Sequence, residues 1–531
     1  LVPSLTALFF SLIRLVPGVK AYVEEQQAKA RAQIAGSGSK ERSQWRKRLP
    51  DVGAEADEVL GEMRALRNKD KAWQGRCSGT VYVGGESYEK HMKLISDAYT
   101  MFQHTNPLHP DVFPSITRFE AEVVAMTAAL LGGGDGGRSD GRAEQAGAGD
   151  AGGKGGKGVK DGANGGEKGG VGREVCGNMT SGGSESILMA VKAARDYMRA
   201  KKGITRPEMH HPPPHSPHRI VPVSAHAAYD KAAEYFHVHL LRAPVADDWC
   251  VEVDAVRRLC SRNTVLIVAS APGFPHGIID PIPELGEIAV RWGTCLHVDC
   301  CLGGFVLPFA KKLGYPLPPF DFSVPGVTSI SVDCHKYGLA PKGTSVVLYR
   351  NREIRKHQFC AVTEWSGGLY VSPTVSGSRS GALIAGAWAA MRGIGMQGYM
   401  DITKRLMEAS KAIVAGVSRI KGLNVVGEPD MTVIAMASDQ LDIYRINDAM
   451  SHRGWALSAL HKPASIHLCV TLQHVGVVDT FLADLQAAVD EVRSSPSPSS
   501  QGMAPIYGAG NRMPDRGAVK ELLLDYMDSL T

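Results

Sequence analysis

A carboxylate and a lysine each follow an apolar run that reads as a buried strand. Asp299 ends the run at 295–299 (CLHVD), and Lys336 follows the run at 328–332, in SVDCHKYG. Ligands of open α/β sheets bind at the carboxyl ends of strands, and a buried carboxylate there needs a cationic partner. A lysine freed of its proton forms an imine with a carbonyl, and a carboxylate can hold a pyridine nitrogen protonated. The pair therefore predicts pyridoxal 5'-phosphate (PLP), held as a Schiff base on Lys336. A structural Asp299 that caps the next turn is the alternative.

Ser181, Gly182 and Gly183 stand between a predicted strand and a predicted helix. Glycines let backbone N–H groups approach an anion there, and the helix dipole favours negative charge. We expect these residues to bind the cofactor phosphate; a plain tight turn is the alternative. His226 follows the next strand and could stack on the pyridine ring, although a lone histidine is more often structural. His335 directly precedes the lysine and joins the predicted cofactor site.

Three further residues could clamp an anionic group of a substrate: Tyr82, His109 and Lys342. The sequence alone does not bring them together. A histidine cluster at positions 210, 211, 215 and 218 resembles a metal site, but prolines at 212–214 and 217 exclude helical ligand spacing. No cysteine or acidic residue joins the cluster, so we favour a solvated loop and predict no metal.

The surrounding elements alternate between apolar strands and helices. Strands are expected at 174–179, 220–224, 265–270, 296–299 and 328–332, in a mostly parallel sheet with covered faces. A further strand at 346–349 is the candidate for an antiparallel direction. Helices are expected at 54–73, 117–131 and 184–202, and a long helix from 381. The fold class is α/β, with a smaller C-terminal α+β region at 423–492 and one amphipathic helix in the tail.

Composition divides the chain further. Residues 132–172 are mostly glycine with charged residues, and they cannot bury enough apolar surface to fold. We interpret them as a disordered insertion within a large cofactor-binding domain at 73–380. Residues 1–72 form an N-terminal segment and linker, and residues 381–531 form a small domain and tail.

The totals exclude some classes of protein. The chain has 531 residues, 44% of them hydrophobic, which indicates a globular protein rather than a disordered one. A net charge of +5 is small for this length, so bulk affinity for nucleic acid is not expected. The ten cysteines show no zinc spacing and no regular framework, which favours reduced thiols.

The first residues favour association with a membrane. Residues 1–13 are apolar but shorter than the roughly 20 residues of a spanning helix, and the basic run at 40–48 (KERSQWRKR) follows. We expect a truncated span or an interfacial helix here, with a core helix as the alternative. The basic run is either a solvated linker or a contact with anionic lipid.

Several motifs resemble those of the sphingosine-1-phosphate lyase family. The likeness runs from about Trp73 to the tail, where GMAPIY at 502–507 matches, and APKG is its most specific element. The matching segments begin at positions 106, 180, 224, 274, 297, 335, 367 and 377: NPLHPDVFP, TSGGSESIL, SAHAAY, FPHG, HVDCCLGGF, HKYGLAPKGTS, GGLYVSPT and GSR.

The resemblance implies a type I PLP-dependent fold, like that of aspartate aminotransferase, and a homodimer with shared active sites. It implies cleavage of the C2–C3 bond of a phosphorylated sphingoid base, which yields a long-chain aldehyde and phosphoethanolamine. By residue match, Lys336 forms the Schiff base, His226 stacks on the cofactor and Asp299 meets the ring nitrogen. Tyr82, His109 and Lys342 match positions near the substrate phosphate. The family is anchored in the endoplasmic reticulum membrane with its catalytic part in the cytosol.

Two departures and two rival functions accompany this resemblance. Cys300 stands where the family commonly has alanine, and the glycine-rich stretch replaces a shorter loop. An amino-acid decarboxylase of the same fold would use the same Lys336, Asp299 and His226, but Lys342 favours a phosphate clamp. A catalytically dead membrane scaffold would not need that intact set. The chain length of the base, and the group that deprotonates its C3 hydroxyl, are not specified by the sequence.

Overall fold

A computed structural model of the chain describes residues 46, 48–70, 73–85, 88–133, 175–205, 218–495 and 516–528. The apolar start at 1–13, most of the basic run at 40–48 and nearly all of the glycine-rich insertion lie outside these residues. So do histidines 210, 211 and 215 and the GMAPIY segment. In the described part no helix is both long enough and apolar enough to cross a membrane. All ten cysteines are described, and none of them forms a disulfide.

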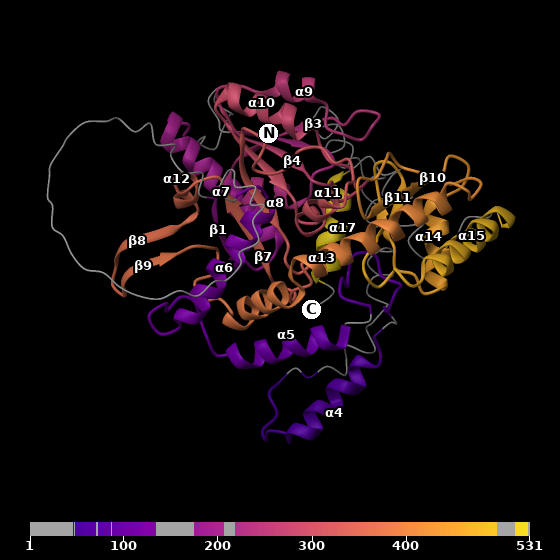
Figure 1. Ribbon diagram of the computed structural model, residues 1–531, viewed down its shortest axis with the longest axis horizontal. Coiled ribbons are helices and arrows are strands. Elements are labelled where there is room, and N and C mark those ends of the chain that lie inside the picture. The colour runs from indigo at the N-terminus through magenta and orange to yellow at the C-terminus, as the bar shows by residue number, and fades with distance from the viewer. Residues whose placement is uncertain are drawn as a thin grey trace, which may run out of the picture.

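A seven-stranded sheet forms the centre of the molecule, with strand order β1-β7-β6-β5-β4-β2-β3 (Figure 1). Strand β7 runs antiparallel to β1 and to β6, and the other neighbouring pairs are parallel. The strands are β1 (Cys176–Thr180), β2 (His218–Pro222), β3 (His239–Ala243), β4 (Thr264–Ser270), β5 (Cys295–Asp299), β6 (Val327–Val332) and β7 (Ser345–Tyr349). The expected α/β class, with a mostly parallel sheet and an antiparallel strand near 346–349, is confirmed.

Most of these strands were expected from their apolar runs, within two residues at each end. The expected strand at 220–224 lies two residues earlier, because Val223 and Ser224 form a turn after Pro222. Strand β3 was not predicted. Its sequence, HLLRA, is only partly buried at the edge of the sheet, so it lacks the continuous apolar run of a central strand.

Helices pack on the sheet and determine where the loops that follow its strands lie. Helix α7 begins at Gly183, one residue before the expected start, and ends at Lys202, where Gly203 adopts a left-handed conformation (φ 67°). Left-handed glycine is the usual end of a helix, since it has no Cβ. The other elements of this region are α8 (Ala228–Phe236), α9 (Val253–Leu259), α10 (Ile282–Trp292), η1 (Gly303–Phe305), α11 (Leu307–Lys312), α12 (Arg352–Arg355) and η2 (Lys356–Gln358).

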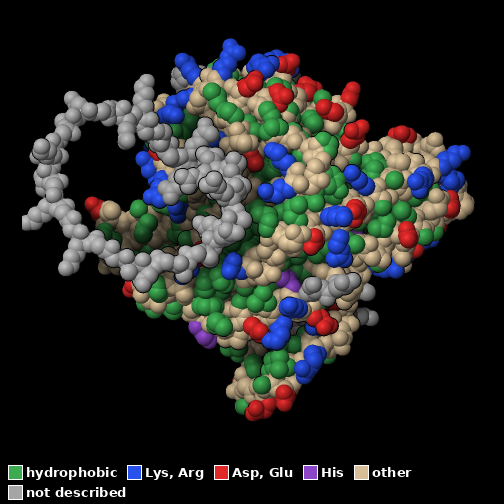
Figure 2. Space-filling view, viewed as in Figure 1, with side chains coloured by type: hydrophobic (Ala, Val, Ile, Leu, Met, Phe, Trp, Pro, Cys, Tyr) green, Lys and Arg blue, Asp and Glu red, His purple; other side chains and the backbone are tan. Residues whose placement is uncertain are grey.

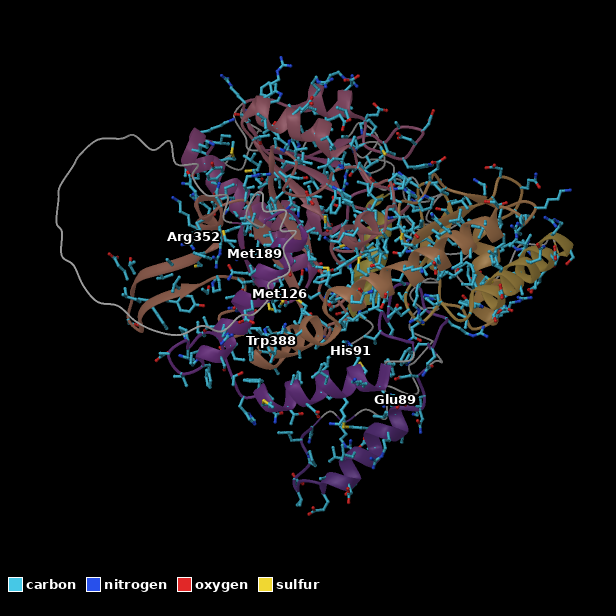
Figure 3. The ribbon with its side chains drawn as sticks, viewed as in Figure 1. Glu89, His91, Met126, Met189, Arg352 and Trp388 are labelled. Carbon is cyan, nitrogen blue, oxygen red and sulfur yellow. The ribbon has the colours of Figure 1, made fainter. Side chains whose placement is uncertain are left out.

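Three helices precede the sheet in the chain: α4 (Ala56–Arg67), α5 (Tyr88–Phe102) and α6 (Pro114–Leu130). Helix α4 is shorter than the helix expected at 54–73. It buries none of its side chains and extends from the edge of the molecule (Figure 1). Helix α6 starts three residues before the expected 117–131 because Pro114 fits a first helical turn. Helix α5, which was not predicted, packs along α13, and Figure 3 marks His91 and Trp388 on these two helices.

The C-terminal part begins with α13 (Gly381–Val417), which is kinked at Gly395. Beyond it lies a second sheet of four antiparallel strands in the order β10-β11-β13-β12. Helix α14 packs on β13, and α15 packs against α14 and α13. This agrees with the α+β region expected at 423–492. The remaining elements are β10 (Asn424–Val425), β11 (Val433–Ala437), α14 (Ile443–His452), β12 (Ser458–Leu460), β13 (Ser465–Cys469), α15 (Val478–Ser494) and α17 (Arg516–Asp528).

A two-stranded hairpin, β8 (Cys360–Trp365) and β9 (Gly368–Ser372), was not predicted. It projects from the body of the molecule (Figure 1), and every residue of β8 is exposed. Its large apolar side chains Val362, Trp365, Leu369 and Val371 are exposed with it. On the face shown in Figure 2, Lys and Arg side chains are interspersed with Asp and Glu.

A buried ion pair joins the N-terminal helices to the sheet. Arg379 donates through both terminal nitrogens to the carboxylate of Glu120 in α6, at 2.7 and 2.8 Å. The same carboxylate accepts the N–H of Met179 in β1 at 3.1 Å. Both charged side chains are nearly buried, at 14% and 11% exposure. Glu120 therefore connects α6, the edge strand β1 and the segment that precedes α13.

Replacing Glu120 with alanine leaves Arg379 buried without a counter-charge. We expect Glu120→Ala to lower the free energy of unfolding by about 3–5 kcal/mol, measured by urea denaturation followed by circular dichroism. The matched control is Asp97→Ala, which removes the carboxylate of an exposed helix pair with Lys93 and should change little. A loss for Glu120→Ala no larger than that of the control would contradict the analysis.

Candidate active site

A cavity of about 380 Å³ opens where four strands of the large sheet end. The segments after β1, β2, β5 and β6 contribute its walls, as expected for ligands at the carboxyl ends of strands. The cavity is lined by Ser181, Gly182, Gly183, Ser184, Glu185, Ile187, His226, Asp299, Cys301, Asp333, His335 and Lys336. The structure therefore brings together all of the predicted cofactor residues.

Asp299 is the last residue of β5 and is 4% exposed. Its Oδ1 atom accepts two hydrogen bonds, from the N–H of Cys301 at 3.0 Å and from the hydroxyl of Ser331 at 3.1 Å. These bonds fix the carboxylate at the cavity wall. Cys300, the departure from the family pattern, is fully buried and does not line the cavity, whereas Cys301 does.

Lys336 makes an ion pair with Asp333, with 2.9 Å between Nζ and Oδ2. Burial lowers the pKa of Lys336, but Cys301 and the carboxylate of Asp333 raise it, and the net shift is upward. Asp333 is only 3% exposed, and its Oδ1 has no hydrogen-bond partner among the described residues. Sequence reasoning missed Asp333; a carboxylate three residues before a lysine, directly after an apolar strand, was the available signal.

The turn from β1 to α7 leaves room for an anion. Gly182 has a positive φ of 155°, and a Cβ on Gly183 would lie 2.8 Å from Asp333 Oδ2, so both positions need glycine. The N–H and hydroxyl of Ser181 both donate to Glu185 Oε2 at 2.6 Å. Because Glu185 occupies both donors of Ser181, the amides of the first helical turn are the groups left for an anion.

Two histidines face this cavity. His226 accepts the N–H of Ala228 at Nδ1 (3.1 Å), so its other ring nitrogen carries the proton. His335 donates from Nδ1 to the carbonyl of Thr344 at 2.7 Å. Burial lowers the pKa of His335, with the positive charges of Lys342 and Lys336 acting in the same direction, while Asp333 and Thr344 oppose the shift. Both side chains line the same cavity as Lys336 and Asp299.

Tyr82 and Lys342 lie together beyond the cavity lining. The Lys342 ammonium is 5.1 Å from the centroid of the Tyr82 ring, and that ring packs edge-on against Tyr337 at 4.8 Å. Burial and the nearby charge of Lys336 lower the pKa of Lys342. His109 is exposed ahead of α6 and does not line the cavity. Within one chain the structure thus pairs Tyr82 with Lys342, and no contact of His109 with either residue is described.

The loop that carries Lys342 is held from two helices. Tyr399 of α13 donates its hydroxyl to the carbonyl of Gly338, and His91 of α5 bonds the carbonyl of Leu339, both at 2.8 Å (Figure 3 marks His91). Leu339 has a positive φ of 55°, and Gly343 turns the chain with a φ of 88°. These contacts fix the separation between Lys342 and Lys336.

The residues at the cavity fit pyridoxal phosphate. An amine, a strand-end carboxylate, an imidazole and a glycine turn before a helix surround one space. They match the aldehyde, the ring nitrogen, the ring face and the phosphate of that cofactor, respectively.

Comparison with known proteins agrees with this geometry. The model of the pyridoxal-dependent decarboxylase conserved domain matches residues 165–438. Sphingosine-1-phosphate lyase from Oryza sativa is 54% identical over 525 residues, which cover 99% of this chain and 89% of that protein. The Arabidopsis thaliana enzyme of the same name is 55% identical over 99% of this chain and 88% of its own length.

Solved structures add the fold. The sphingosine-1-phosphate lyase of Burkholderia pseudomallei superposes with a TM-score of 0.73 at 40% identity, covering 85% of this chain and 94% of that one. A Lactobacillus brevis glutamate decarboxylase gives a TM-score of 0.67 at 18% identity over 87% of this chain and 98% of its own, which supports the fold alone. The chain belongs to the sphingosine-1-phosphate lyase family, a group of enzymes with the pyridoxal-dependent decarboxylase domain and a type I PLP-dependent fold.

Proposed function

We propose that this protein cleaves the C2–C3 bond of sphingosine 1-phosphate or a related phosphorylated sphingoid base. The products are a long-chain aldehyde and phosphoethanolamine. The observation that carries the proposal is the gathering of Lys336, Asp299 and His226 at one cavity, in a chain 54% identical over nearly its whole length to a sphingosine-1-phosphate lyase.

Each residue at the cavity has a proposed role. Lys336 holds the cofactor through Nζ, Asp299 meets the ring nitrogen, and His226 covers one face of the ring. The backbone amides at 182–184 bind the phosphate, with Ser181 supporting the turn through Glu185 and His335 facing the same space. When bound, pyridoxal phosphate supplies a protonated ring that accepts the electron pair of the breaking bond. Nζ of Lys336, once released, is a group that can carry a proton to the substrate.

The position of Lys342 favours a lyase over an amino-acid decarboxylase. Its ammonium lies outside the cofactor cavity, beside the buried Tyr82 ring. A substrate that carries a phosphate beyond its amine would place that phosphate near such a charge, whereas a decarboxylase needs a carboxylate over the cofactor ring. We therefore assign Lys342 and Tyr82 to the phosphate end of the substrate.

We further propose a homodimer with shared active sites. The apolar side chains of the β8–β9 hairpin are exposed in one chain, as is His109, the member of the predicted clamp that stands apart. A second copy would cover the hairpin and could bring His109 to its partner's substrate phosphate. For the location we propose the endoplasmic reticulum membrane, with the catalytic part in the cytosol. The apolar run at 1–13 and the basic residues at 40–48 support this proposal.

The proposed activity is tested by incubating the purified protein with a phosphorylated sphingoid base and measuring long-chain aldehyde by mass spectrometry. We expect aldehyde from the native protein and none from Lys336→Ala, because the variant lacks the imine-forming amine. Borohydride reduction and peptide mapping should place the cofactor on Lys336. Decarboxylation of an amino acid without aldehyde release, or label on another lysine, would overturn the proposal.

Lys342→Ala should lower kcat/KM for the phosphorylated base by roughly ten- to a hundredfold, since a charge-assisted contact contributes about 1.5–3 kcal/mol. The visible spectrum of the bound cofactor should stay unchanged. The matched control is Lys404→Ala, an exposed lysine of α13, which should behave like the native protein. If the preference for phosphorylated over unphosphorylated base is the same in native and Lys342→Ala proteins, Lys342 has no part in phosphate binding.

Asp333→Asn should shift the pH dependence of cofactor attachment. The Asp333 carboxylate helps to raise the pKa of Lys336, and only the deprotonated amine attacks the cofactor aldehyde. Removing the carboxylate charge lowers the pKa of Lys336. The rate of cofactor attachment, followed by the absorbance of the attached cofactor, should therefore increase with pH over a lower pH range than in the native protein. Asp401→Asn, an exposed site on α13, serves as the control. A rate profile that stays in place or moves to higher pH would contradict this role.

A further inference from the structure

A row of polar side chains crosses the interior of the large sheet just behind Asp299. His297 lies two residues before Asp299 on β5, and Ser329 and Ser331 face these two residues from β6. All are buried, at 0% exposure for His297 and Ser331 and 2% for Ser329. Strands covered on both faces are normally apolar, so a polar row at this depth is an unusual arrangement.

The hydrogen bonds of this row all run from donor to acceptor in one order, from Ser329 through His297 and Ser331 to Asp299. The Ser331 hydroxyl donates its one proton to Asp299 Oδ1, so it must accept from His297 Nε2, at 3.1 Å. With its proton on Nε2, His297 then accepts from the Ser329 hydroxyl at Nδ1, at 2.9 Å. Burial lowers the pKa of His297 to about 4, against the opposing charge of Asp299, so the ring is neutral near pH 7. Each donor therefore points toward the Asp299 carboxylate.

We propose that His297 is a positioning residue that acts through Ser331 to hold the Asp299 carboxylate turned toward the cofactor ring nitrogen. This inference rests on the proposed role of Asp299. Ser331 and the N–H of Cys301 occupy Oδ1, which leaves Oδ2 for the ring nitrogen. Donors aligned on a carboxylate stabilise its charged form, so the proton stays on the ring nitrogen.

The direct test observes the ring nitrogen itself. Native protein and Ser331→Ala are loaded with pyridoxal phosphate labelled with ¹⁵N in the ring, and the nitrogen resonance is recorded. The resonance of the native protein should be that of a protonated pyridine. In Ser331→Ala, and in His297→Leu, which has no N–H donor for Ser331, it should move toward the unprotonated position, and Ser331→Thr, which keeps the hydroxyl, should restore it. An unmoved resonance in Ser331→Ala would overturn the proposal.

Ser270 offers a matched control. It ends β4 on the opposite side of Asp299, is 5% exposed, and its hydroxyl makes no described hydrogen bond to the carboxylate. Ser270→Ala therefore removes a buried hydroxyl beside Asp299 without touching the row. The ring-nitrogen resonance of Ser270→Ala should match that of the native protein. An equal shift in Ser270→Ala and Ser331→Ala would indicate a general packing effect and would contradict the proposal.

A second measurement uses a cofactor analogue with carbon in place of the ring nitrogen. With pyridoxal phosphate, Ser331→Ala should reduce kcat roughly tenfold or more, as expected for losing a hydrogen bond to a charged group. With the analogue, native and variant proteins should have nearly equal kcat, because there is no ring proton to hold. An equal loss with both cofactors would assign Ser331 a merely structural role. A native protein that forms no aldehyde with pyridoxal phosphate would instead refute the proposed function.

Discussion

Both faces of the large sheet are covered by other parts of the protein. Charged side chains can therefore be accommodated only at the ends of its strands. Along β4, β5 and β7 every residue is buried. Charged groups therefore collect at the carboxyl edge, and each needs a partner there because water is excluded. The contact of Lys336 with Asp333, at 2.9 Å, is the central example. The glycine turn, the helix N-terminus and the neighbouring histidines are arranged around that paired charge.

The same constraint explains why much of the site could be predicted from the sequence. Strand-end residues such as Asp299, Lys336 and His226 follow apolar runs, and apolar runs mark the buried strands whose ends must meet. The predicted α/β sheet is confirmed for that reason. Lys342 was assigned to the site by its charge and by the family resemblance, and the structure places it within electrostatic reach of Lys336. The roles assigned to these residues stay predictions.

Other features depend on information that a single sequence does not display. Ser331 acquires its contact with Asp299 from the register of β5 against β6, and register cannot be read from a hydrophobic pattern that is continuous. The hairpin escaped prediction because both of its faces are exposed in one chain, so its residues show no burial pattern. Helix α6 buries an apolar face that includes Ile116 and Val123 and could be predicted from it, whereas α5 buries only Ile95 and was missed.

Gly183 and Asp333 limit one another. A methyl group on Gly183 would lie 2.8 Å from a carboxylate oxygen of Asp333, although 150 positions separate the two in the chain (333 − 183 = 150). A side chain at position 183 would therefore displace the same carboxylate oxygen that pairs with Lys336 at 2.9 Å. The shape of the glycine turn and the counter-charge of the lysine are for this reason one physical problem, although they belong to segments far apart in the chain.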